Sequence, residues 1–183
     1  IFELFDKNCP KVIDGDDNRG PYFMSDSQYE SLPMPARHLV EMESYKYTID
    51  GFPATSLIAQ LGCPFRCGFC GGRNSKSLRM IRNRSMDSIV NGIRWLHTTY
   101  GYTGFMFYDD EMNVNKQFVQ LLNKICDLQA ELGVEFRLRG FIKAELFNEE
   151  QAEAMARAGF RWVLCGFEGA NPRILENIDK IAT

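Results

Sequence analysis

Long hydrophobic runs, strong net charge and a secretory start are all missing from this sequence of 183 residues. No segment approaches the ~18 consecutive apolar residues of a membrane helix, and no apolar stretch follows a basic start, so we expect neither a membrane span nor a signal peptide. Lys and Arg total 21, Asp and Glu total 24, and the net charge of −3 indicates no particular partner. With 45% apolar residues the chain can bury a sizeable core, which excludes intrinsic disorder.

Cysteine is also scarce for a disulfide-stapled domain of this length, yet three of the six cysteines fall within eight positions. This clustering argues against a secreted scaffold and favours metal chemistry in a reducing compartment, so we expect a cytoplasmic protein. The chain begins with Ile1 instead of methionine, from which we expect its natural start to lie upstream.

Residues 1–53 differ in composition from the rest of the chain. Positions 1–50 hold ten acidic and five basic residues, and five of the seven prolines fall at or before residue 53. The stretch 14–20 is rich in turn-forming residues. We interpret 1–53 as an irregular linker or the tail of an upstream domain, and 54–183 as a folded core.

From residue 54 onward, short apolar runs alternate with segments of helical periodicity. Helices are expected to begin at polar residues typical of helix starts, namely Ser85, Asn115, Asn148 and Asn171. The alternation predicts parallel βαβ units, an α/β fold with about four units, too few to close a barrel. The expected strands cover residues 56–62, 104–109, 134–140 and 160–168.

Cys63, Cys67 and Cys70 follow the first expected strand and are separated by three and then two residues. Three thiolates so spaced can point at one centre, and soft thiolates select zinc, copper(I) or iron–sulfur clusters. A structural zinc site takes four ligands, and no second C-x2-C pair occurs. A cuboidal cluster with three thiolates would leave one iron open for catalysis. Cys126 and Cys165 are most simply core residues.

This C-x3-C-x2-C loop after the first strand of a βα series, with Phe69 before the last cysteine, resembles the radical S-adenosylmethionine (radical SAM) superfamily. The resemblance covers residues 54–183 and implies part of a (β/α)6 TIM-like barrel. Because that barrel normally has six units, we expect a longer natural chain and an unpaired edge at the fourth strand.

The resemblance implies that Cys63, Cys67 and Cys70 ligate a [4Fe–4S] cluster. The amino and carboxylate groups of S-adenosylmethionine would chelate its fourth iron. A low-potential electron donor of the flavodoxin or ferredoxin type would then allow reductive cleavage of S-adenosylmethionine to a 5′-deoxyadenosyl radical.

The resemblance also implies roles for residues at the strand ends. Phe69 would pack beside the adenine or the cluster. Asp109, Asp110 and Glu111 stand where the family more often has Gly-Gly-Glu, so one of these carboxylates would accept hydrogen bonds from the amino group of the cofactor. An acidic helix cap is the alternative for Asp110 and Glu111.

Two further residues match the family less closely. Arg139 would reach the cofactor carboxylate or a substrate, although Arg137 points the same way and competes for that role. Glu168 would lie near the ribose, with a structurally paired charge as the alternative.

The segment 32–39, LPMPARHL, followed by Tyr45, resembles the linker of cobalamin-binding radical SAM proteins. The signature Asp-x-His-x-x-Gly is absent from the chain, so a domain that binds cobalamin would precede Ile1. Three functions stay open: a cobalamin-linked enzyme, often a methyltransferase; a cobalamin-independent member such as a methylthiotransferase; and a non-catalytic iron–sulfur or zinc module. The substrate stays unknown.

A basic stretch spans residues 63–84 without a single acidic residue. It could hold a phosphate or carboxylate, but we favour a role in balancing an anionic cluster and cofactor. Too few aromatic residues are interleaved to predict nucleic-acid binding. Its basic members are Arg66, Arg73, Lys76, Arg79, Arg82 and Arg84.

Overall fold

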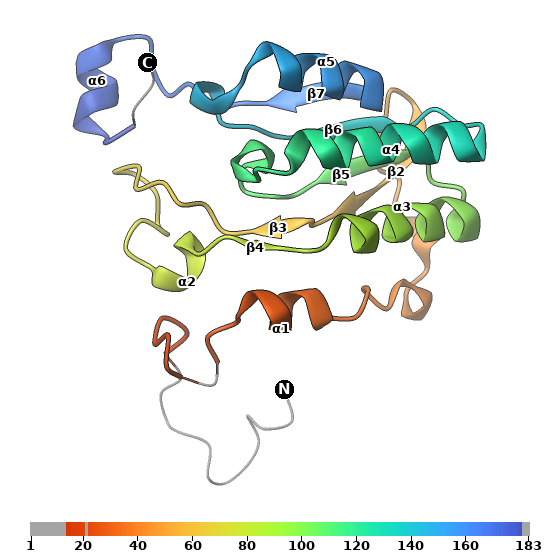
Figure 1. The fold of residues 1–183 in the computed structure, drawn as a ribbon, viewed down its shortest axis with the longest axis horizontal. Helices are drawn as coiled ribbons and strands as arrows, with labels where there is room; N and C mark the ends of the chain where they lie inside the picture. Colours follow the sequence, from red (N-terminus) through yellow and green to blue (C-terminus); the bar gives the residue numbers. More distant parts are fainter. Residues whose placement is uncertain (1–13, 21, 181–183) are drawn as a thin grey trace, which may run out of the picture.

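Four parallel strands and the helices that connect them form the centre of the molecule (Figure 1). The computed structural model describes residues 14–20 and 22–180. In the main sheet the order is β1-β2-β5-β6-β7, with β1 antiparallel to β2 and the other pairs parallel. A second, two-stranded sheet pairs β3 with β4. The strands are β1 (Thr48–Ile49), β2 (Phe52–Leu57), β3 (Gln60–Leu61), β4 (Arg82–Asn83), β5 (Gly104–Phe107), β6 (Arg137–Phe141) and β7 (Phe160–Leu164).

A helix follows each parallel strand, and Figure 1 shows α3 and α4 in front of the sheet. The predicted caps at Ser85, Asn148 and Asn171 are confirmed, because each side chain accepts a backbone N–H of the first turn. The four helices are α3 (Met86–Tyr100), α4 (Phe118–Leu132), α5 (Glu149–Ala158) and α6 (Pro172–Asn177); shorter ones are α1 (Asp26–Ser31) and α2 (Lys76–Arg79).

The predicted start of α4 at Asn115 is wrong. Asn115 ends a 3-10 turn, η4 (Met112–Val114), and its Oδ1 accepts the N–H of Gln117 at 2.9 Å. The Asn115 side chain thus caps a short turn that leads to Gln117, and the α-helix begins three residues later at Phe118.

The core lies between the sheet and these helices. All four residues of β5 are buried, and the rings of Phe105 and Phe136 meet edge to face with centroids 5.2 Å apart. The fully buried side chains come from every layer, for example Ile93, Leu96, Phe107, Leu122, Ile125 and Leu138.

The strands are shorter than the sequence pattern predicts. The apolar run 56–62 is not one strand, because β2 ends at Leu57 and residues 60–61 turn away to pair with β4. Strand β5 covers residues 104–107, which pair with β2 on one side and β6 on the other. The strands predicted at 134–140 and 160–168 are observed at 137–141 and 160–164. Pairing with neighbours, rather than apolar content, sets these limits.

The described part of the N-terminal region packs along β2. The hydroxyl of Tyr29, a buried residue of α1, donates to the carbonyl of Ile58 at 3.1 Å, and Arg37 Nη2 donates to the carbonyl of Ser56 at 2.6 Å. Strand β1 pairs with β2, so the expected boundary at residue 53 falls inside a strand.

The α/β class and the partial TIM-like barrel are confirmed. Among the described residues, β7 is the last strand of the sheet, and its Trp162 and Val163 side chains are exposed. No described helix has the length and apolar character needed to cross a membrane.

Candidate functional site

The cysteine loop, residues 62–75, lies beyond the carboxyl end of β2. Gly62 N–H donates to Asp110 Oδ2 at 3.1 Å, which ties the loop to the end of β5. Gly68 N–H donates to the carbonyl of Ile178 at 2.5 Å, so the loop also contacts the chain after α6. In Figure 1 the loop, drawn in yellow, lies on the same side of the molecule as α6. Segments far apart in the sequence therefore meet at this end of the sheet.

The loop presents three free thiols. Cys63 and Cys67 are half-buried and Cys70 is exposed. Backbone hydrogen bonds order the loop at its start and in its middle: Cys63 N–H donates to the carbonyl of Leu78, and Cys70 N–H to that of Cys67, each at 3.0 Å. Burial raises the pKa of the Cys63 thiol, against the opposing effect of a backbone hydrogen bond at Phe65.

The residue types of the loop fit an iron–sulfur cluster with three cysteine ligands, since a structural zinc site takes four. Among the described residues, no three His, Cys, Asp or Glu side chains are grouped closely enough to hold a metal ion. The loop thus supplies suitable donor atoms, and it must rearrange locally for them to converge on one centre. Ligation by these cysteines stays a prediction.

Asp109 and Asp110, which follow β5, are occupied by backbone donors. Asp109 is buried, and its Oδ1 accepts the N–H of Ala59 at 2.8 Å. Asp110 accepts the N–H of Gly62, as described above. Both carboxyls therefore connect the end of β5 to the chain that leads from β2 into the cysteine loop.

Glu111 differs from its two neighbours. Its Oε2 is buried and has no hydrogen-bond partner among the described residues. Burial raises the pKa of Glu111 to about 7, against the opposing effect of the Lys143 and Lys180 ammonium groups. A buried acceptor without a donor is costly, so Glu111 Oε2 is an acceptor open to the donor of a ligand.

Arg137 and Arg139 project from β6, and among the described residues they differ in whether their donors are bonded. The Arg137 guanidinium lies 3.6 Å from the centroid of the Phe52 ring and donates to the carbonyl of Glu135 at 2.6 Å. Arg139 Nε is buried with no partner among the described residues. Of the two arginines, Arg139 therefore has a donor, Nε, that is open to a ligand.

The buried carboxyl of Asp109 should make stability depend on pH. Burial raises its pKa from 3.8 to about 7, so the folded state keeps a proton that the unfolded state loses. This contribution is complete below pH 3.8 and is lost as the pH rises through about 7. In the wild type the free energy of unfolding should fall by on the order of a few kcal/mol over this pH range. In Asp109→Asn the fall should be smaller, and the part that remains should come from Glu111.

Denaturant unfolding of the wild type and the variant across this pH range measures the effect. Asp127→Asn, at an exposed position on α4, is the matched control and should follow the wild type. An Asp109→Asn variant with the pH dependence of the wild type would contradict the assignment.

Glu168 and Phe69 both interact with Lys180. Glu168 Oε1 forms an ion pair with Lys180 Nζ at 2.9 Å, as expected if Glu168 is a structurally paired charge. The ring of Phe69 is 58% exposed, and the Lys180 ammonium lies 5.9 Å from its centroid. Burial lowers the pKa of Lys180, but the Glu168 bond and the charges of Glu168 and Cys67 outweigh it, so the pKa is raised.

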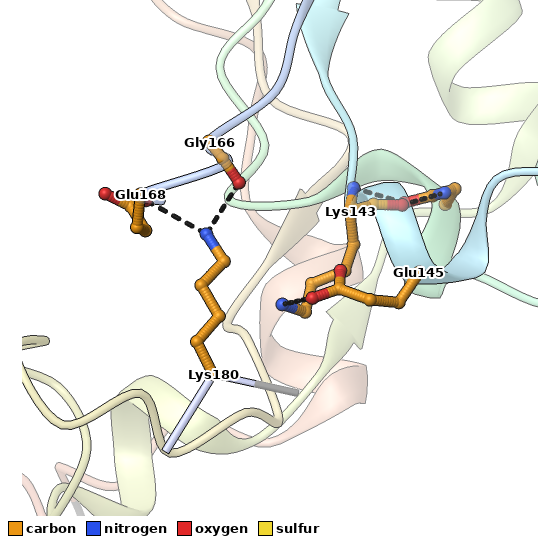
Figure 2. A network of polar contacts seen from close by, with 6 residues as sticks. Lys143, Glu145, Gly166, Glu168 and Lys180 are labelled. Atoms are coloured by element: carbon orange, nitrogen blue, oxygen red, sulfur yellow. Dashed lines mark hydrogen bonds and ion pairs between the residues drawn. The ribbon is translucent and has the colours of Figure 1, made fainter. Parts of the chain in front are cut away.

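The sequence reasoning missed Lys143, Glu145 and Lys180. Lys143 Nζ pairs with Glu145 Oε1 at 3.0 Å, and both side chains are almost fully buried (Figure 2). Asn113 fixes the Lys143 backbone, because its Oδ1 accepts the Lys143 N–H at 2.8 Å and its Nδ2 donates to the Lys143 carbonyl at 3.0 Å. Charged residues directly after β6 were the available signal for Lys143 and Glu145. Lys180 offered none, because it follows the last predicted helix.

Four of the six basic side chains of the stretch 63–84 donate to backbone carbonyls of the chain. Arg73 donates to the carbonyl of Gly68 at 2.9 Å, and Arg79 to that of Pro64 at 2.8 Å. Arg82 is buried and donates to nearby carbonyls, and Arg84 donates to the carbonyl of a residue before β1. Arg73 and Arg79 thus bond carbonyls within the cysteine loop, and Arg82 and Arg84 bond carbonyls outside it, whereas Arg66 and Lys76 are exposed.

The other described cysteines pack as predicted. Cys126 on α4 and Cys165 after β7 are half-buried and lie against the hydrophobic core. Cys9 lies outside the described residues.

Comparison with known proteins identifies relatives of this region. A family model described as the Radical SAM superfamily matches residues 57–183. An uncharacterized methyltransferase of Pyrococcus horikoshii is 31% identical over 154 residues, which cover 82% of this chain and 32% of the relative. Bacteriochlorophyllide d C-12(1)-methyltransferase of Chlorobaculum tepidum is 30% identical over 127 residues, 68% of this chain and 26% of the relative. The chain thus spans about a third or less of the length of these relatives.

Solved structures show the same fold. The radical S-adenosylmethionine methyltransferase TsrM of Kitasatospora setae, with cobalamin and a [4Fe–4S] cluster bound, has a TM-score of 0.60 and 25% identity, covering 68% of this chain and 24% of TsrM. The cobalamin-dependent S-adenosylmethionine radical enzyme OxsB has a TM-score of 0.59 at 20% identity, covering 71% of this chain and 20% of OxsB. Because the family model matches more than half of the chain, from the end of β2 through the cysteine loop and the later strand ends, the chain belongs to the radical SAM superfamily.

Proposed function

We propose that this chain forms the S-adenosylmethionine-binding core of a cobalamin-dependent radical SAM methyltransferase. The observation that carries the proposal is a loop with three free cysteines at the same sheet end as a buried, unpaired carboxylate oxygen of Glu111. Relatives named as methyltransferases, and a neighbour solved with cobalamin and a [4Fe–4S] cluster, support this choice. Cobalamin would be bound by a part of the protein outside this chain.

Cys63, Cys67 and Cys70 would hold a [4Fe–4S] cluster through their thiolates. The cluster would supply low-potential electron transfer from a flavodoxin- or ferredoxin-type donor, the chemistry needed for reductive cleavage of S-adenosylmethionine to a 5′-deoxyadenosyl radical. Half-burial of Cys63 and Cys67 would shelter the ligands from water.

Glu111 and Arg139 would bind the two charged ends of the methionine part of S-adenosylmethionine. Glu111 Oε2, which has no donor, would accept a hydrogen bond from the amino group, and Arg139 Nε, which has no acceptor, would donate to the carboxylate. Phe69 would cover the adenine or the cluster with its exposed ring. Glu168 would lie near the ribose.

The full-length protein tests this function. After anaerobic reconstitution with iron and sulfide and chemical reduction, added S-adenosylmethionine should be converted to methionine and 5′-deoxyadenosine, measured by chromatography. The absorption spectrum of the protein should show bound cobalamin. Cleavage without cobalamin would favour a cobalamin-independent enzyme, and absence of both would favour a non-catalytic metal-binding module.

Replacing Glu111 with glutamine should weaken binding of S-adenosylmethionine. Glutamine keeps the size and one acceptor oxygen but removes the charge, and a lost charge-assisted hydrogen bond reduces affinity by about 10- to 100-fold. Equilibrium binding to the reconstituted protein measures the change.

Asp87→Asn is the matched control, since Asp87 pairs with Lys124 on the helix surface. It should bind S-adenosylmethionine like the wild type. Unchanged affinity in Glu111→Gln would show that Glu111 does not bind the amino group of S-adenosylmethionine. The next candidate acceptor is then Oε2 of Glu145, which is buried and has no partner among the described residues.

A further inference from the structure

Both phenylalanines of the cysteine loop lie against lysine side chains from other parts of the chain. Lys143 Nζ lies 4.7 Å from the centroid of the Phe65 ring, and Lys180 Nζ lies 5.9 Å from that of Phe69. These distances are within the range of cation–π attraction. One lysine follows β6 and the other follows α6, so the loop is held from two directions.

Each ammonium group is fixed by its own carboxylate partner (Figure 2). Lys143 pairs with Glu145, with 5% and 12% of the two side chains exposed. Lys180 pairs with Glu168 and also donates to the carbonyl of Gly166 at 2.6 Å. Burying an ammonium is costly unless it is paired, so these bonds fix where each positive charge lies.

The chain around Lys180 also grips the loop through backbone and surface contacts. The Gly68 N–H donates to the Ile178 carbonyl, and a Cβ at Gly68 would lie 3.0 Å from that oxygen, so only glycine fits easily here. Arg73 bonds both the Gly68 carbonyl and, at 3.0 Å, Asp179.

Backbone strain accompanies this grip. Glu168 and Asp179 have positive φ angles of 56° and 49°, an unfavourable conformation for residues other than glycine. Glu168 is itself the partner of Lys180, and Asp179 precedes Lys180 in the chain. The surrounding contacts hold both residues in this conformation.

We propose that Lys143 and Lys180 are positioning residues, which hold the cysteine loop in place and keep two positive charges beside the cysteine ligands. The charge part of this proposal rests on the proposed function, because it concerns the anionic cluster that the cysteines would bind. The holding part concerns the loop alone and applies with or without a cluster.

Thiol labelling of the cluster-free, full-length protein tests the holding part. In Lys180→Met, alkylation by iodoacetamide at Cys67 and Cys70, mapped by mass spectrometry, should be roughly fivefold faster than in the wild type. Lys180→Arg keeps the charge and a donor for Glu168, and it should restore the slow rate.

Lys143 needs a paired substitution, because Lys143→Met alone would leave Glu145 buried without a partner. The double variant Lys143→Met/Glu145→Gln should also label faster at the cysteine loop. Lys124→Met, which removes a lysine from a surface ion pair with Asp87, is the matched control and should label like the wild type.

Redox titration of the reconstituted proteins tests the charge part. Removing a nearby positive charge makes reduction of an anionic cluster less favourable, so Lys180→Met should shift the midpoint potential to more negative values, whereas Lys180→Arg should not. An unchanged potential in Lys180→Met would overturn this part.

Cys126 on α4 reports on the fold during labelling. Unchanged labelling of the loop in both the Lys180→Met and the double variant overturns the holding part. Labelling that rises equally at Cys126 indicates loosening of the whole fold and overturns it as well. If the wild type takes up no iron and sulfide, the proposed function and the charge part fail, while the labelling rates still decide whether the lysines hold the loop.

Discussion

Cys67→Ala is expected to abolish cluster binding and cleavage of S-adenosylmethionine. Cys67 is the middle residue of the three proposed ligands. Without it, only the thiolates of Cys63 and Cys70 remain for a cluster that needs three. Changing a residue that only hydrogen-bonds a metal ligand lowers metal affinity or activity by about 10- to 100-fold, so removal of a ligand itself should lower both by more than about 100-fold. Iron and sulfide content after anaerobic reconstitution, and formation of 5′-deoxyadenosine, measure the two effects.

Cys126→Ala is the matched control for this experiment. Cys126 is also a half-buried free cysteine, but it packs against the core from α4. It should keep its iron, sulfide and cleavage activity. Full cluster content in Cys67→Ala would rule out the assignment of the C-x3-C-x2-C ligands.

Gly62→Ala is expected to disrupt the entrance to the cysteine loop. Gly62 has a φ of +88°, and a Cβ there would lie 2.1 Å from the carbonyl oxygen of Met80 and 2.8 Å from its carbon. Both neighbours are backbone atoms, so no side chain can rotate away. The change should also displace Cys63 and the hydrogen bond to Asp110, and it should lower the free energy of unfolding by roughly 3 kcal/mol or more. Denaturant unfolding and iron content measure the result.

Two other glycines separate the causes of this effect. Gly71 is in the same loop, and a Cβ added there would meet no atom within 4 Å. Gly71→Ala should therefore change the free energy of unfolding little. Gly133 ends α4 with a φ of +64°, and a Cβ added there would meet no atom within 4 Å. Gly133→Ala should lower the free energy of unfolding by about 1 kcal/mol because of the backbone conformation alone. If Gly62→Ala were no worse than Gly133→Ala, the contact with Met80 would not matter.

Features encoded by a few neighbouring residues could be predicted from the sequence. The caps at Ser85, Asn148 and Asn171 depend on one side chain and the next two or three N–H groups, and all three are confirmed. The alternation of strands and helices is also local and was sufficient for the α/β class. The family resemblance needed, in addition, the spacing of Cys63, Cys67 and Cys70.

Features that depend on partners distant in sequence could not be predicted. The apolar run 56–62 reads as one strand, yet Asp109 takes the Ala59 N–H and residues 60–61 pair with β4. The choice among three adjacent carboxylates likewise needs the structure, because only Glu111 is left with a buried, unpaired oxygen. Lys180 is bound by Gly166 and Glu168, which lie 14 and 12 residues earlier in the chain, and no sequence motif indicates these contacts.

The bonds from Asp109 and Asp110 to the chain after β2 have a consequence for the order of assembly during synthesis. They join residues 50 and 48 positions apart, so the start of the cysteine loop can take its shape only after β5 has been made and docked beside β2. Until then the loop has contacts with nearby residues, such as the bond from Cys63 N–H to the Leu78 carbonyl, but it lacks those with Asp109 and Asp110. We therefore expect metal loading to follow formation of the β2–β5 pair, and a nascent chain that ends before residue 109 to take up no cluster.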